Sequence, residues 1–543
     1  MGDLAAGLTV AVIALPLAMA LGIASIPVDV AAQSAVSPPS AGLVTAVVAG
    51  FLISLLGGSR VQIGGPTGAF IVVVYGVCLR HGYAGLVTAT ALAGVLLILL
   101  AVARVGRFIQ FVPYPVTAGF TTGIAVIIAA SQLRDFFGLD LRDASGKMET
   151  LPAEFIEKLS VLGRYFHTLD VSTVSVALGT LLALVWMRHR MPRAPYYLIA
   201  VVLASISVVL FGLDVETVGS RFGAIPRTLP LPALPDFSLA LVREVFPDAV
   251  TIALLCAVES LLSAVVADGM TGYRHKSDCE LLGQGVANVA SALFAGLPAT
   301  GAIARTAANV KSGGTTPIAG MLHAFLLLGF MLAAAPLAAQ IPLAALSAVL
   351  LLVAWNMSQL DHFRSLLSAP RSDVLVLLVT FFLTVVVDLT VAVGTGMVLA
   401  SFLFMKRMAD TAEVKGLVGN GEEGDEDWGL PQLRNIPEGV EVYQINGPFF
   451  FGCADRLKDV LGAVAKTPRV FILRMRNVPT IDATGMHALS ELVDKCQRGG
   501  TRLVITGLQP QPKRALEGAG LIKRIGASNI FSTTEEALNA FRA

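Results

Sequence analysis

Charged residues are scarce in this sequence of 543 residues, in which Asp, Glu, Lys and Arg together make up 14%. Soluble globular proteins carry about 25% charged residues, so an ordinary soluble fold is excluded for most of the chain. Hydrophobic residues reach 55% and the mean hydropathy is +0.74, which predicts a polytopic membrane protein. The formal net charge of +1 gives no electrostatic basis for nucleic acid as a partner.

Cysteine pairs and catalytic motifs are also lacking. The five cysteines are scattered without a CxxC pair or a metal-ligand spacing, so the sequence predicts neither a disulfide framework nor a zinc site. No Ser/His/Asp, HExxH or P-loop arrangement is visible. We therefore expect a protein that is not an enzyme and that needs no cofactor. A cleavable signal peptide is not expected either, because the apolar run 4–26 has no basic n-region and can span a bilayer.

Long apolar runs are abundant, and they predict about fourteen membrane crossings. A full crossing needs about 20 mostly apolar residues. Two segments, 65–79 and 299–312, are too short or too interrupted for ordinary spans. The other expected spans are 5–26, 41–57, 83–103, 115–132, 171–188, 195–213, 247–267, 281–296, 316–334, 341–356, 373–388 and 391–405.

The placement of Lys and Arg predicts the orientation. With a cytoplasmic N-terminus, the short inside loops collect basic residues such as Arg60, Arg188 and Arg274. An even number of crossings places the C-terminus inside as well. The outside segment 133–170 is expected to carry an amphipathic helix at 152–166 on the membrane interface, because its apolar residues recur at a helical spacing.

Polar sequence returns after Lys406. Residues 1–408 are therefore expected to form the membrane domain, 409–436 a linker with a solvated acidic cluster, and 437–543 one small soluble α/β domain. The expected strands are 440–445, 470–473, 502–505 and 530–531, and the expected helices lie near 455–465, 484–497, 511–520 and 534–542.

Two interrupted stretches share a pattern and predict a binding site. Residues 65–70 read GPTGAF and residues 298–303 read PATGAI, each just after a long apolar segment. Matched breaks in two halves of a chain are the best sequence pointer to a transporter's substrate site. A half-helix that begins inside the membrane presents unpaired N–H groups and the positive end of its dipole, which attract an anion. Ordinary kinks are the alternative, and one break alone would favour them. The candidate substrate-binding residues are Pro66, Thr67, Gly68, Ala69, Phe70, Thr300, Gly301, Ala302, Ile303, Ala304 and Arg305.

Two charged residues stand out within the apolar segments. Arg305 is expected two turns into the second half-helix, where it attracts the anion or pairs with a carboxylate; snorkelling to the membrane surface is the alternative. Glu259 lies in the middle of an apolar span, and Ser263 is expected on the same helix face. Together they are candidates for coupling to H⁺ or Na⁺, and a structural partnership between Glu259 and Arg305 is the alternative.

Polar residues elsewhere in the spans are weaker candidates. Glu280 is expected to stabilise the N-terminus of its own helix, and His323 is expected to be a packing residue. Asn288 and Asn309 stay open as weak site candidates.

Several motifs together resemble the SulP family of sulfate permease-type anion transporters, and the resemblance covers essentially the whole chain. The motifs in the first half are DLAAGLTV at 3–10, LPLAMA at 15–20 and GSR at 58–60, followed by Gly65 and Pro66. In the second half they are CELLGQGVAN at 279–288 and PATGAIART at 298–306. The soluble part resembles a STAS domain through DATG at 482–485, where Thr484 is a candidate regulatory hydroxyl and, alternatively, the N-cap of helix 484–497.

The resemblance implies an architecture and a mechanism. It implies fourteen segments in two inverted repeats of seven, with a core and a gate subdomain, half-helices at the third and tenth segments, and a homodimer. It further implies a substrate site between those half-helices that faces the first and eighth segments, and an elevator-type movement. On this chain the third segment corresponds to Pro66 to Phe70, the tenth to Thr300 to Arg305 and the eighth to Glu259. The first segment adds Leu21, at a position that is aromatic in relatives.

Departures from the family pattern affect the expected substrate. Many relatives have glutamine where this chain has Leu17, and serine where it has Ala304. A site with fewer polar side chains puts sulfate in doubt and leaves bicarbonate, chloride or an organic carboxylate open.

The sequence therefore predicts a secondary active transporter of small anions, such as an organic dicarboxylate, bicarbonate or sulfate, in the bacterial inner membrane. The coupling ion is expected to be H⁺ or Na⁺, and both the N-terminus and the STAS domain are expected to be cytoplasmic. The expected partners are the anion, membrane lipid, a second copy of the chain and cytoplasmic regulators at the STAS domain. A passive anion channel or exchanger and a membrane-anchored STAS signalling protein are the alternatives.

Overall fold

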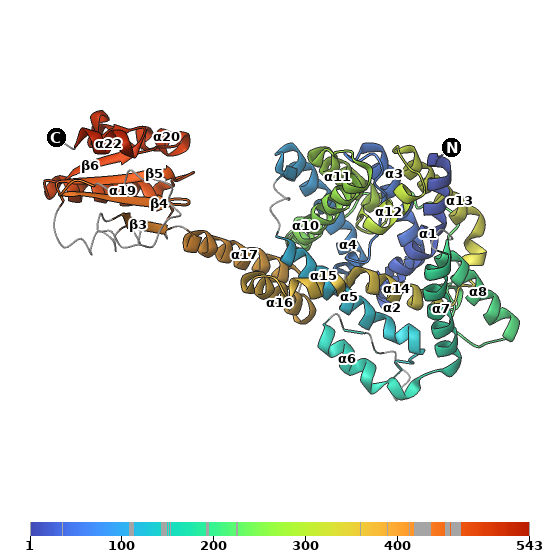
Figure 1. Cartoon of the computed structure of the whole chain (residues 1–543). Helices are drawn as coiled ribbons and strands as arrows, with labels where there is room; N and C mark the ends of the chain where they lie inside the picture. The colour runs from blue at the N-terminus through green and yellow to red at the C-terminus, as the bar shows by residue number, and fades with distance from the viewer. Residues whose placement is uncertain are drawn as a thin grey trace. The chain divides into compact units, whose positions relative to one another are not determined.

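The chain divides into two compact units, Met1–Val398 and Leu399–Ala543 (Figure 1). The structure is a computed structural model that describes all residues except 1, 35, 108–112, 143–148, 150, 153, 192–194, 224–225, 359, 388, 412, 418–435, 451–456, 458–467 and 542–543. The predicted acidic cluster lies outside the described residues, as does the predicted helix 455–465 apart from Leu457.

The first unit is almost entirely helical. Among the described residues, nine helices are long and apolar enough to cross a membrane by length and composition. The polytopic helical class predicted from the sequence is therefore confirmed. The principal helices are α1 (Gly2–Ser25), α3 (Pro38–Leu56), α4 (Phe70–Val102), α5 (Tyr114–Phe137), α7 (Val171–Arg190), α8 (Tyr196–Phe211), α10 (Leu239–Thr271), α11 (Ser277–Leu293), α12 (Ile303–Lys311), α13 (Ile318–Ala338), α14 (Leu343–Ser358), α16 (Arg371–Val386) and α17 (Leu389–Thr411).

Each of the fourteen predicted segments has a helical counterpart, because α4 contains two helices. Gly82 has φ 66° and ψ −173°, which interrupts α4 between the predicted segments 65–79 and 83–103. A positive φ is accessible to glycine without the steric cost that a Cβ atom brings. Helix α4 therefore accounts for both the third and the fourth predicted segment.

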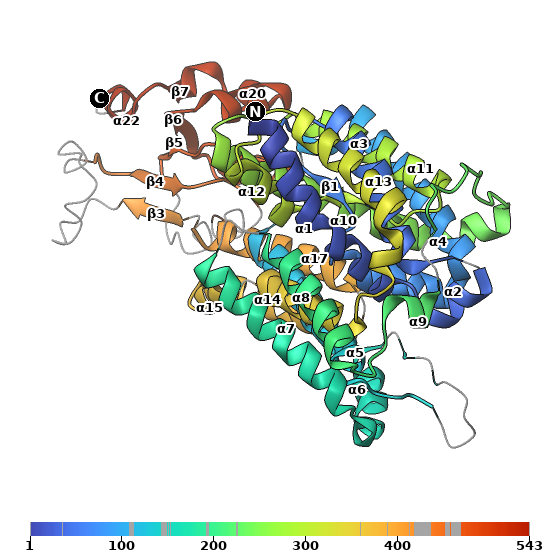
Figure 2. The same cartoon turned by 90° about the vertical axis from the view of Figure 1, so that its right-hand side faces the viewer.

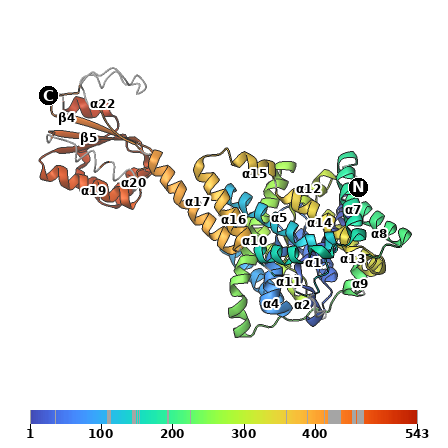
Figure 3. The same cartoon turned by 90° about the horizontal axis from the view of Figure 1, so that it is seen from below.

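The helices of the first unit form two groups. In the first helix group (α1, α3, α4, α10, α11, α12 and α13), α4 packs against α10 and α11 (Figure 3), and α1 packs against α3 and α13. Helix α12 lies beside α1 and α10 (Figure 2). In the second helix group (α5, α7, α8, α14 and α16), α5 packs against α14 and α16.

A two-stranded antiparallel pairing joins the two halves of the first helix group. Strand β1 (Gly64–Gly65) pairs with β2 (Thr300–Gly301), with Gly64 opposite Gly301 and Gly65 opposite Thr300. Strand β1 lies four residues before α4, and β2 lies one residue before α12. The sequence analysis predicted the two breaks but not the backbone pairing between them.

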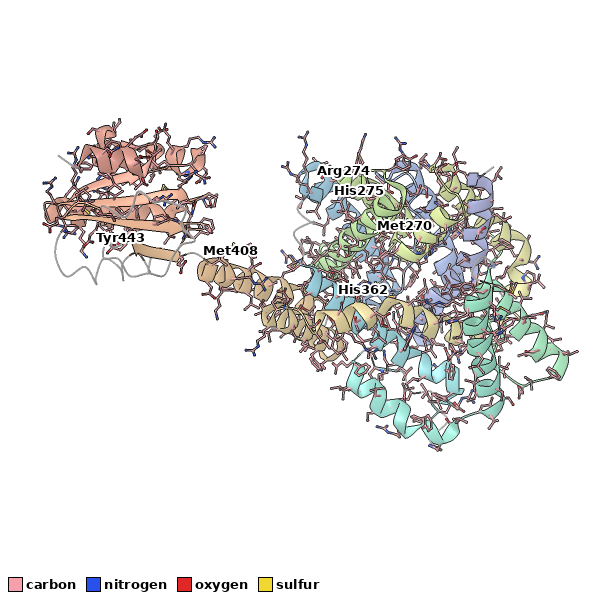
Figure 4. All side chains as sticks on the ribbon, in the orientation of Figure 1. Met270, Arg274, His275, His362, Met408 and Tyr443 are labelled. Carbon is pink, nitrogen blue, oxygen red and sulfur yellow. The ribbon has the colours of Figure 1, made fainter. Side chains whose placement is uncertain are left out.

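The turn between α10 and α11 carries Arg274 and His275 (Figure 4). The backbone N–H of His275 donates to Asp268 at 3.0 Å, and its ring Nδ1 lies 2.7 Å from the same oxygen. One turn into α11, the Glu280 carboxylate accepts hydrogen bonds from the backbone N–H groups of Gly58 at 2.8 Å and Ser59 at 3.2 Å. Glu280 therefore fastens the loop that leads to β1, a role beyond the predicted stabilisation of its own helix.

Helix α6 (Phe155–Arg164) occupies the segment predicted to be amphipathic. Its side chains Val161 and Leu162 are buried against the end of α5, together with Leu139 and Leu141. Other apolar residues of the predicted stretch 152–166, namely Ile156, Leu159 and Phe166, are exposed. An exposed apolar stripe is compatible with a membrane interface, whereas the buried face of α6 was not predicted.

The second unit contains a five-stranded sheet in the order β3-β4-β5-β6-β7, in which β3 is antiparallel to β4 and the other pairs are parallel. The predicted strands and the helices after residue 480 are confirmed, whereas β3 lies within the stretch predicted as a linker. The elements are β3 (Glu413–Leu417), β4 (Val440–Asn446), β5 (Val470–Asn477), α19 (Ala483–Arg498), β6 (Arg502–Thr506), α20 (Pro510–Gly518), α21 (Leu521–Ile525), β7 (Ile530–Phe531) and α22 (Thr534–Ala540).

Apolar side chains fill both faces of this sheet. Leu473, Ile505 and Leu489 belong to the cluster under α19, and Ile472, Val504 and Leu538 belong to the cluster under α22. Successive residues of a strand point to opposite faces, so the uninterrupted apolar runs in β5 and β6 fit a sheet covered on both sides.

Candidate anion-binding site

The two interrupted stretches meet at the centre of the first helix group. Besides the β1–β2 pairing, the Ala302 N–H donates to the Ile63 carbonyl at 2.8 Å. Helix α12 begins at Ile303, one residue beyond β2, whereas α4 begins at Phe70, after the four residues 66–69 that follow β1. At the start of α4, the N–H groups of Phe70 and Ile71 donate to the carbonyls of Thr67 and Gly68 at 3.2 and 3.1 Å. In α12 the first bond to a carbonyl four residues earlier comes from Thr306, so the N–H groups of residues 303–305 lack such an acceptor and make this end a suitable place for an anion.

Arg305 lies in the first turn of α12, and the prediction of two turns into the half-helix was wrong. The reason is that Thr300 and Gly301 are extended and paired as β2, which delays the start of the helix. The guanidinium is therefore at the positive end of the helix dipole and close to the strand pair.

The Arg305 side chain is buried, with 4% exposure, so it does not snorkel to the membrane surface. Its Nη2 donates to the Pro66 carbonyl at the opposite break. Its Nη1 is buried and has no hydrogen-bond partner. Among the described residues, no carboxylate forms an ion pair with Arg305. An arginine that is buried with one open N–H₂ group leaves a positive site that an anion can complete.

Gly65 leaves the space that this guanidinium occupies. Its φ is +144°, a conformation that is essentially restricted to glycine, and a Cβ atom at this position would lie 2.7 Å from Arg305 Nη1. Glycine is thus required here for two reasons, namely its positive φ and the close approach of the guanidinium.

Glu259 lies on α10 and contacts the same break, at the residue after Pro66. Its Oε2 accepts a hydrogen bond of 2.9 Å from the Thr67 hydroxyl, and its residue exposure is 9%. Glu259 and Arg305 are not paired with each other, so the proposed structural partnership between them is absent. The two opposite charges instead occupy separate positions on either side of residues 66 and 67.

Ser263 lies one turn further along α10 than Glu259, but its hydroxyl is used elsewhere. It contacts the Thr306 hydroxyl at 3.2 Å, and Thr306 in turn accepts from the Ile63 N–H at 3.1 Å. Ser263 therefore ties α10 to α12 and to the strand pair. In this conformation the hydroxyl does not contact Glu259.

The two threonine hydroxyls of the site donate to protein acceptors. Thr67 donates to Glu259, and Thr300 donates to the Cys256 carbonyl at 3.0 Å. The donors that remain open are Arg305 Nη1 and the N–H groups of residues 303–305 at the start of α12, since those at the start of α4 donate to the carbonyls of Thr67 and Gly68. The site therefore offers fewer hydroxyl donors to a ligand than the sequence analysis expected.

At Gly68 the start of α4 packs closely against the second helix group. A Cβ atom at Gly68 would lie 2.8 Å from Met357 Sδ on α14 and 3.3 Å from Ile128 Cδ1 on α5. The second helix group thus presents apolar side chains to the start of α4.

The other predicted site residues are distributed around this junction. Ala69, Phe70 and Ala302 are buried, whereas Ile303 is 37% exposed and Ala304 is exposed. Leu21 is buried in α1, with 4% exposure. Its place in the substrate site stays a prediction.

Several positioning residues were missed or were rated as weak candidates. Asn288 holds the Ala299 peptide with two hydrogen bonds of 2.9 Å, one to the carbonyl and one from the N–H. The Leu297 N–H donates to the Thr45 hydroxyl at 2.6 Å. The buried Gln62 amide donates to the Ser260 hydroxyl at 2.9 Å. In the sequence, an amide or hydroxyl side chain within an apolar helix indicates that the side chain forms an internal hydrogen bond. It does not indicate which group is the partner.

Two further weak candidates have structural positions. Asn309 donates to the Val61 carbonyl at 2.8 Å, which fastens α12 to the segment before β1. His323 is fully buried in α13. Neither side chain forms a hydrogen bond with Glu259, whose described partner is Thr67.

Thr484 is not the N-cap of its helix, and that alternative was wrong. The cap is Asp482, whose carboxylate accepts from the Gly485 N–H at 2.7 Å. Thr484 is the second residue of α19 and is exposed. An aspartate before the first turn is a preferred cap, since its oxygen satisfies an N–H group that the helix leaves open.

Comparison with known families covers nearly the whole chain. Residues 1–380 match the sulfate permease family and residues 433–537 match the STAS domain. YvdB of Bacillus subtilis, named as a candidate sulfate transporter, is 39% identical over 536 residues, which cover 98% of this chain and 96% of the relative. The bicarbonate transporter BicA of Synechocystis sp. is 33% identical over 556 residues, which cover 99% of this chain and 93% of the relative. These proteins are transporters and not enzymes, as the sequence predicts for this chain.

Two solved structures resemble this one. The transmembrane domain of a cyanobacterial bicarbonate transporter, BicA, matches with a TM-score of 0.62 and 32% identity, over 74% of this chain and 97% of that one. Murine Slc26a9, an anion transporter in the inward-facing state, matches with a TM-score of 0.83 over 99% of this chain and 91% of that one. Its identity is 19%, so this second match supports the fold alone.

Proposed function

The chain belongs to the sulfate permease family, and on that premise we propose that it is a secondary active transporter for a small anion. The anion binds between the starts of α4 and α12, at the residues predicted from the sequence. The observation that carries this proposal is Arg305, which is buried, has no carboxylate partner among the described residues and keeps Nη1 open beside two helix N-termini.

The substrate that fits best is a small, singly charged anion of the bicarbonate class. One guanidinium supplies the positive charge, and both threonine hydroxyls already donate within the protein. A doubly charged sulfate or dicarboxylate would bring two negative charges near the Glu259 carboxylate. The names of the relatives cover both bicarbonate and sulfate, so an uptake panel has to separate them.

Glu259 is the proposed coupling residue. A carboxylate near a bound anion repels it unless a proton or a cation joins the site. Thr67 links the two parts of the site, because it precedes the start of α4 and donates to Glu259. We propose that H⁺ or Na⁺ binds at Glu259 together with the anion and thereby supplies the driving force.

The proposed movement is of the elevator type. Gly68 places the start of α4 directly against Met357 and Ile128 of the second helix group, whose apolar side chains carry no charge that would hold the anion. Sliding of the first helix group along this apolar surface would carry the site from one side of the membrane to the other. The proposal includes a homodimer in the bacterial inner membrane, with the N-terminus and the STAS domain on the cytoplasmic side, where Thr484 is available to regulators.

The test is uptake into proteoliposomes that contain the purified full chain. Bicarbonate, chloride, sulfate and a C4-dicarboxylate are offered in turn, each with an imposed proton gradient, an imposed sodium gradient or neither. We expect accumulation of bicarbonate or another small monovalent anion only with one of the gradients. Accumulation of none of the four would contradict the proposal, and equal fluxes with and without gradients would identify a passive channel.

A further inference from the structure

A second group of charged residues lines a cavity away from the site described above. The cavity has a volume of about 220 Å³ and lies between α1, α2 (Val28–Ser34), α4, α5, α6 and α9 (Val218–Phe222). Helices α2, α5 and α6 lie at the same end of the first unit (Figure 1). Its walls therefore come from both helix groups. The lining residues used below are Asp29, Tyr75, Arg134, Asp135, Lys158 and Arg221.

Lys158 is the unusual residue of this cavity. It lies on α6, outside the membrane-spanning helices, and yet its exposure is only 4%. Its ammonium lies 5.0 Å from the centre of the Tyr75 ring. The ammonium forms neither an ion pair nor a hydrogen bond with any described residue, and burial lowers its pKa to about 8. Lysine is rarely this buried unless it is paired.

The other charges around the cavity have partners or neighbours of opposite sign. Arg221 contacts both Asp135, at 2.7 Å, and Glu216. A sixth charged residue of the lining, Glu149, lies 3.6 Å from Arg164.

Two charges remain near the Tyr75 hydroxyl, which itself donates to the Leu151 carbonyl at 2.8 Å. Asp29 and Arg134 both act on Tyr75 electrostatically, one negative and one positive. Burial lowers the Lys158 pKa, and no described carboxylate of the lining forms an ion pair with its ammonium. Lys158 is thus the one cation of the lining that lacks a described countercharge.

We propose that this cavity is a second anion site, in which Lys158 binds a small monovalent anion over the edge of the Tyr75 ring. The geometry favours one negative charge, because a single ammonium lacks a counterion. Chloride and bicarbonate fit this description, and their shared chemistry is a compact monovalent anion.

The location indicates what the site does. Tyr75 lies five residues after Phe70, about 7.5 Å along the same helix from the start of α4. The cavity also lies at the boundary between the two helix groups. It therefore serves as a vestibule at the outer end of the pathway to the substrate site, and this role, unlike the binding itself, rests on the proposed function.

The experiment measures how fast Lys158 is acetylated in the full-length protein in detergent, followed by peptide mass spectrometry at pH 8. Chloride, bicarbonate or sulfate is compared with gluconate at equal ionic strength, and the exposed Lys523 of α21 is the internal control. A bound anion stabilises the ammonium and raises the Lys158 pKa, so less neutral amine is available to react. A rise from about 8 to about 9 slows acetylation about fivefold.

We expect saturable protection of Lys158 by chloride or bicarbonate, weaker protection by sulfate and no protection of Lys523. The same protection is expected in Arg305→Gln, because the two sites are separate. Equal rates in all four salts would overturn the proposal, and so would protection that disappears in Arg305→Gln, which would place the binding at the substrate site. In proteoliposomes, Lys158→Met is expected to raise the KM for external anion severalfold with an unchanged maximal rate. If transport is absent altogether, the proposed function fails while the protection assay still decides the second site.

Discussion

The Thr67 hydroxyl donates to Glu259 Oε2 over 2.9 Å, and this bond joins the start of the third-segment helix to the middle of α10. On the other side of the same break, Arg305 donates to the Pro66 carbonyl. Pro66 therefore contacts the cationic Arg305, and its neighbour Thr67 contacts the carboxyl group of Glu259. The two charged side chains do not pair with each other. An anion and a coupling cation can each find a separate place there.

The hydrogen bond between Thr67 and Glu259 predicts that substitutions of these two residues have non-additive effects on uptake. Glu259→Gln should lower uptake at least tenfold and remove its dependence on the driving gradient, because the amide cannot take up a proton or balance a cation. Thr67→Val should lower uptake as well, and the double variant should be no worse than Glu259→Gln alone. Initial rates in proteoliposomes measure the cycle, with Thr67→Ser as the hydroxyl-retaining control. Effects that simply multiply would show that the two residues act independently.

The conformation of Gly65 predicts that even an alanine at this position lowers both stability and uptake. Gly65→Ala should cost about 1–3 kcal/mol of unfolding free energy because of its φ of +144°, and the new methyl group would displace Arg305 Nη1. Uptake should therefore fall at least tenfold. Gly179→Ala on α7 is the matched control, since a Cβ atom there has no neighbour within 4 Å. Thermal unfolding and uptake of both variants are the measurements, and a Gly65→Ala protein with normal uptake contradicts this role.

The two hydrogen bonds between Asn288 and Ala299 predict that substitution of Asn288 lowers the stability of the fold. Asn288→Leu leaves the buried Ala299 N–H without its hydrogen bond, at an expected cost of about 1–3 kcal/mol. The loss should appear as a lower unfolding midpoint in detergent. Asn356→Leu is the control and should leave the midpoint nearly unchanged, because Asn356 is exposed on α14 and its amide has only a long contact of 3.5 Å with the Tyr197 hydroxyl. Equal midpoints for the two variants would show that the Ala299 peptide needs no such clamp.

The N-terminus of α19 predicts unequal effects of two neighbouring residues. Asp482→Ala removes the cap on the Gly485 N–H and should cost about 1 kcal/mol, whereas Thr484→Ala should stay within about 0.5 kcal/mol. Hydrogen exchange of the first turns of α19 in the full chain measures both. A larger loss in Thr484→Ala than in Asp482→Ala would reverse the assignment of the cap.

Much of the fold is predictable because the bilayer imposes a length on apolar runs. All fourteen segments have helical counterparts in the structure, including the separation of segments 65–79 and 83–103 at Gly82. The four strands from 440 onward were predictable from short apolar runs between turns. Strand β3 was not, since its pairing with β4 depends on a tertiary neighbour rather than on a pattern of its own.

The candidate site was predictable as a pair of breaks, but the geometry around these breaks was not. Strands of two residues carry no periodicity, so the β1–β2 pairing leaves no sequence signal, and the start of α12 was placed too early as a result. Side-chain hydrogen bonds such as Ser263 to Thr306 depend on which helices are neighbours. Lys158 was missed for the same reason, because a lysine on an amphipathic helix is expected to face water, whereas here the neighbouring helices cover it.

The most direct test of the central claim is anion uptake by Arg305→Gln beside the wild-type chain, at equal amounts of reconstituted protein and with the same imposed gradient. The substitution removes the open positive group but keeps a side chain that can donate to the Pro66 carbonyl. We predict that uptake falls about 100-fold while the unfolding midpoint does not drop, since a buried charge without a countercharge costs stability. Arg305→Lys should retain part of the uptake. Wild-type uptake by a folded Arg305→Gln protein would contradict the account.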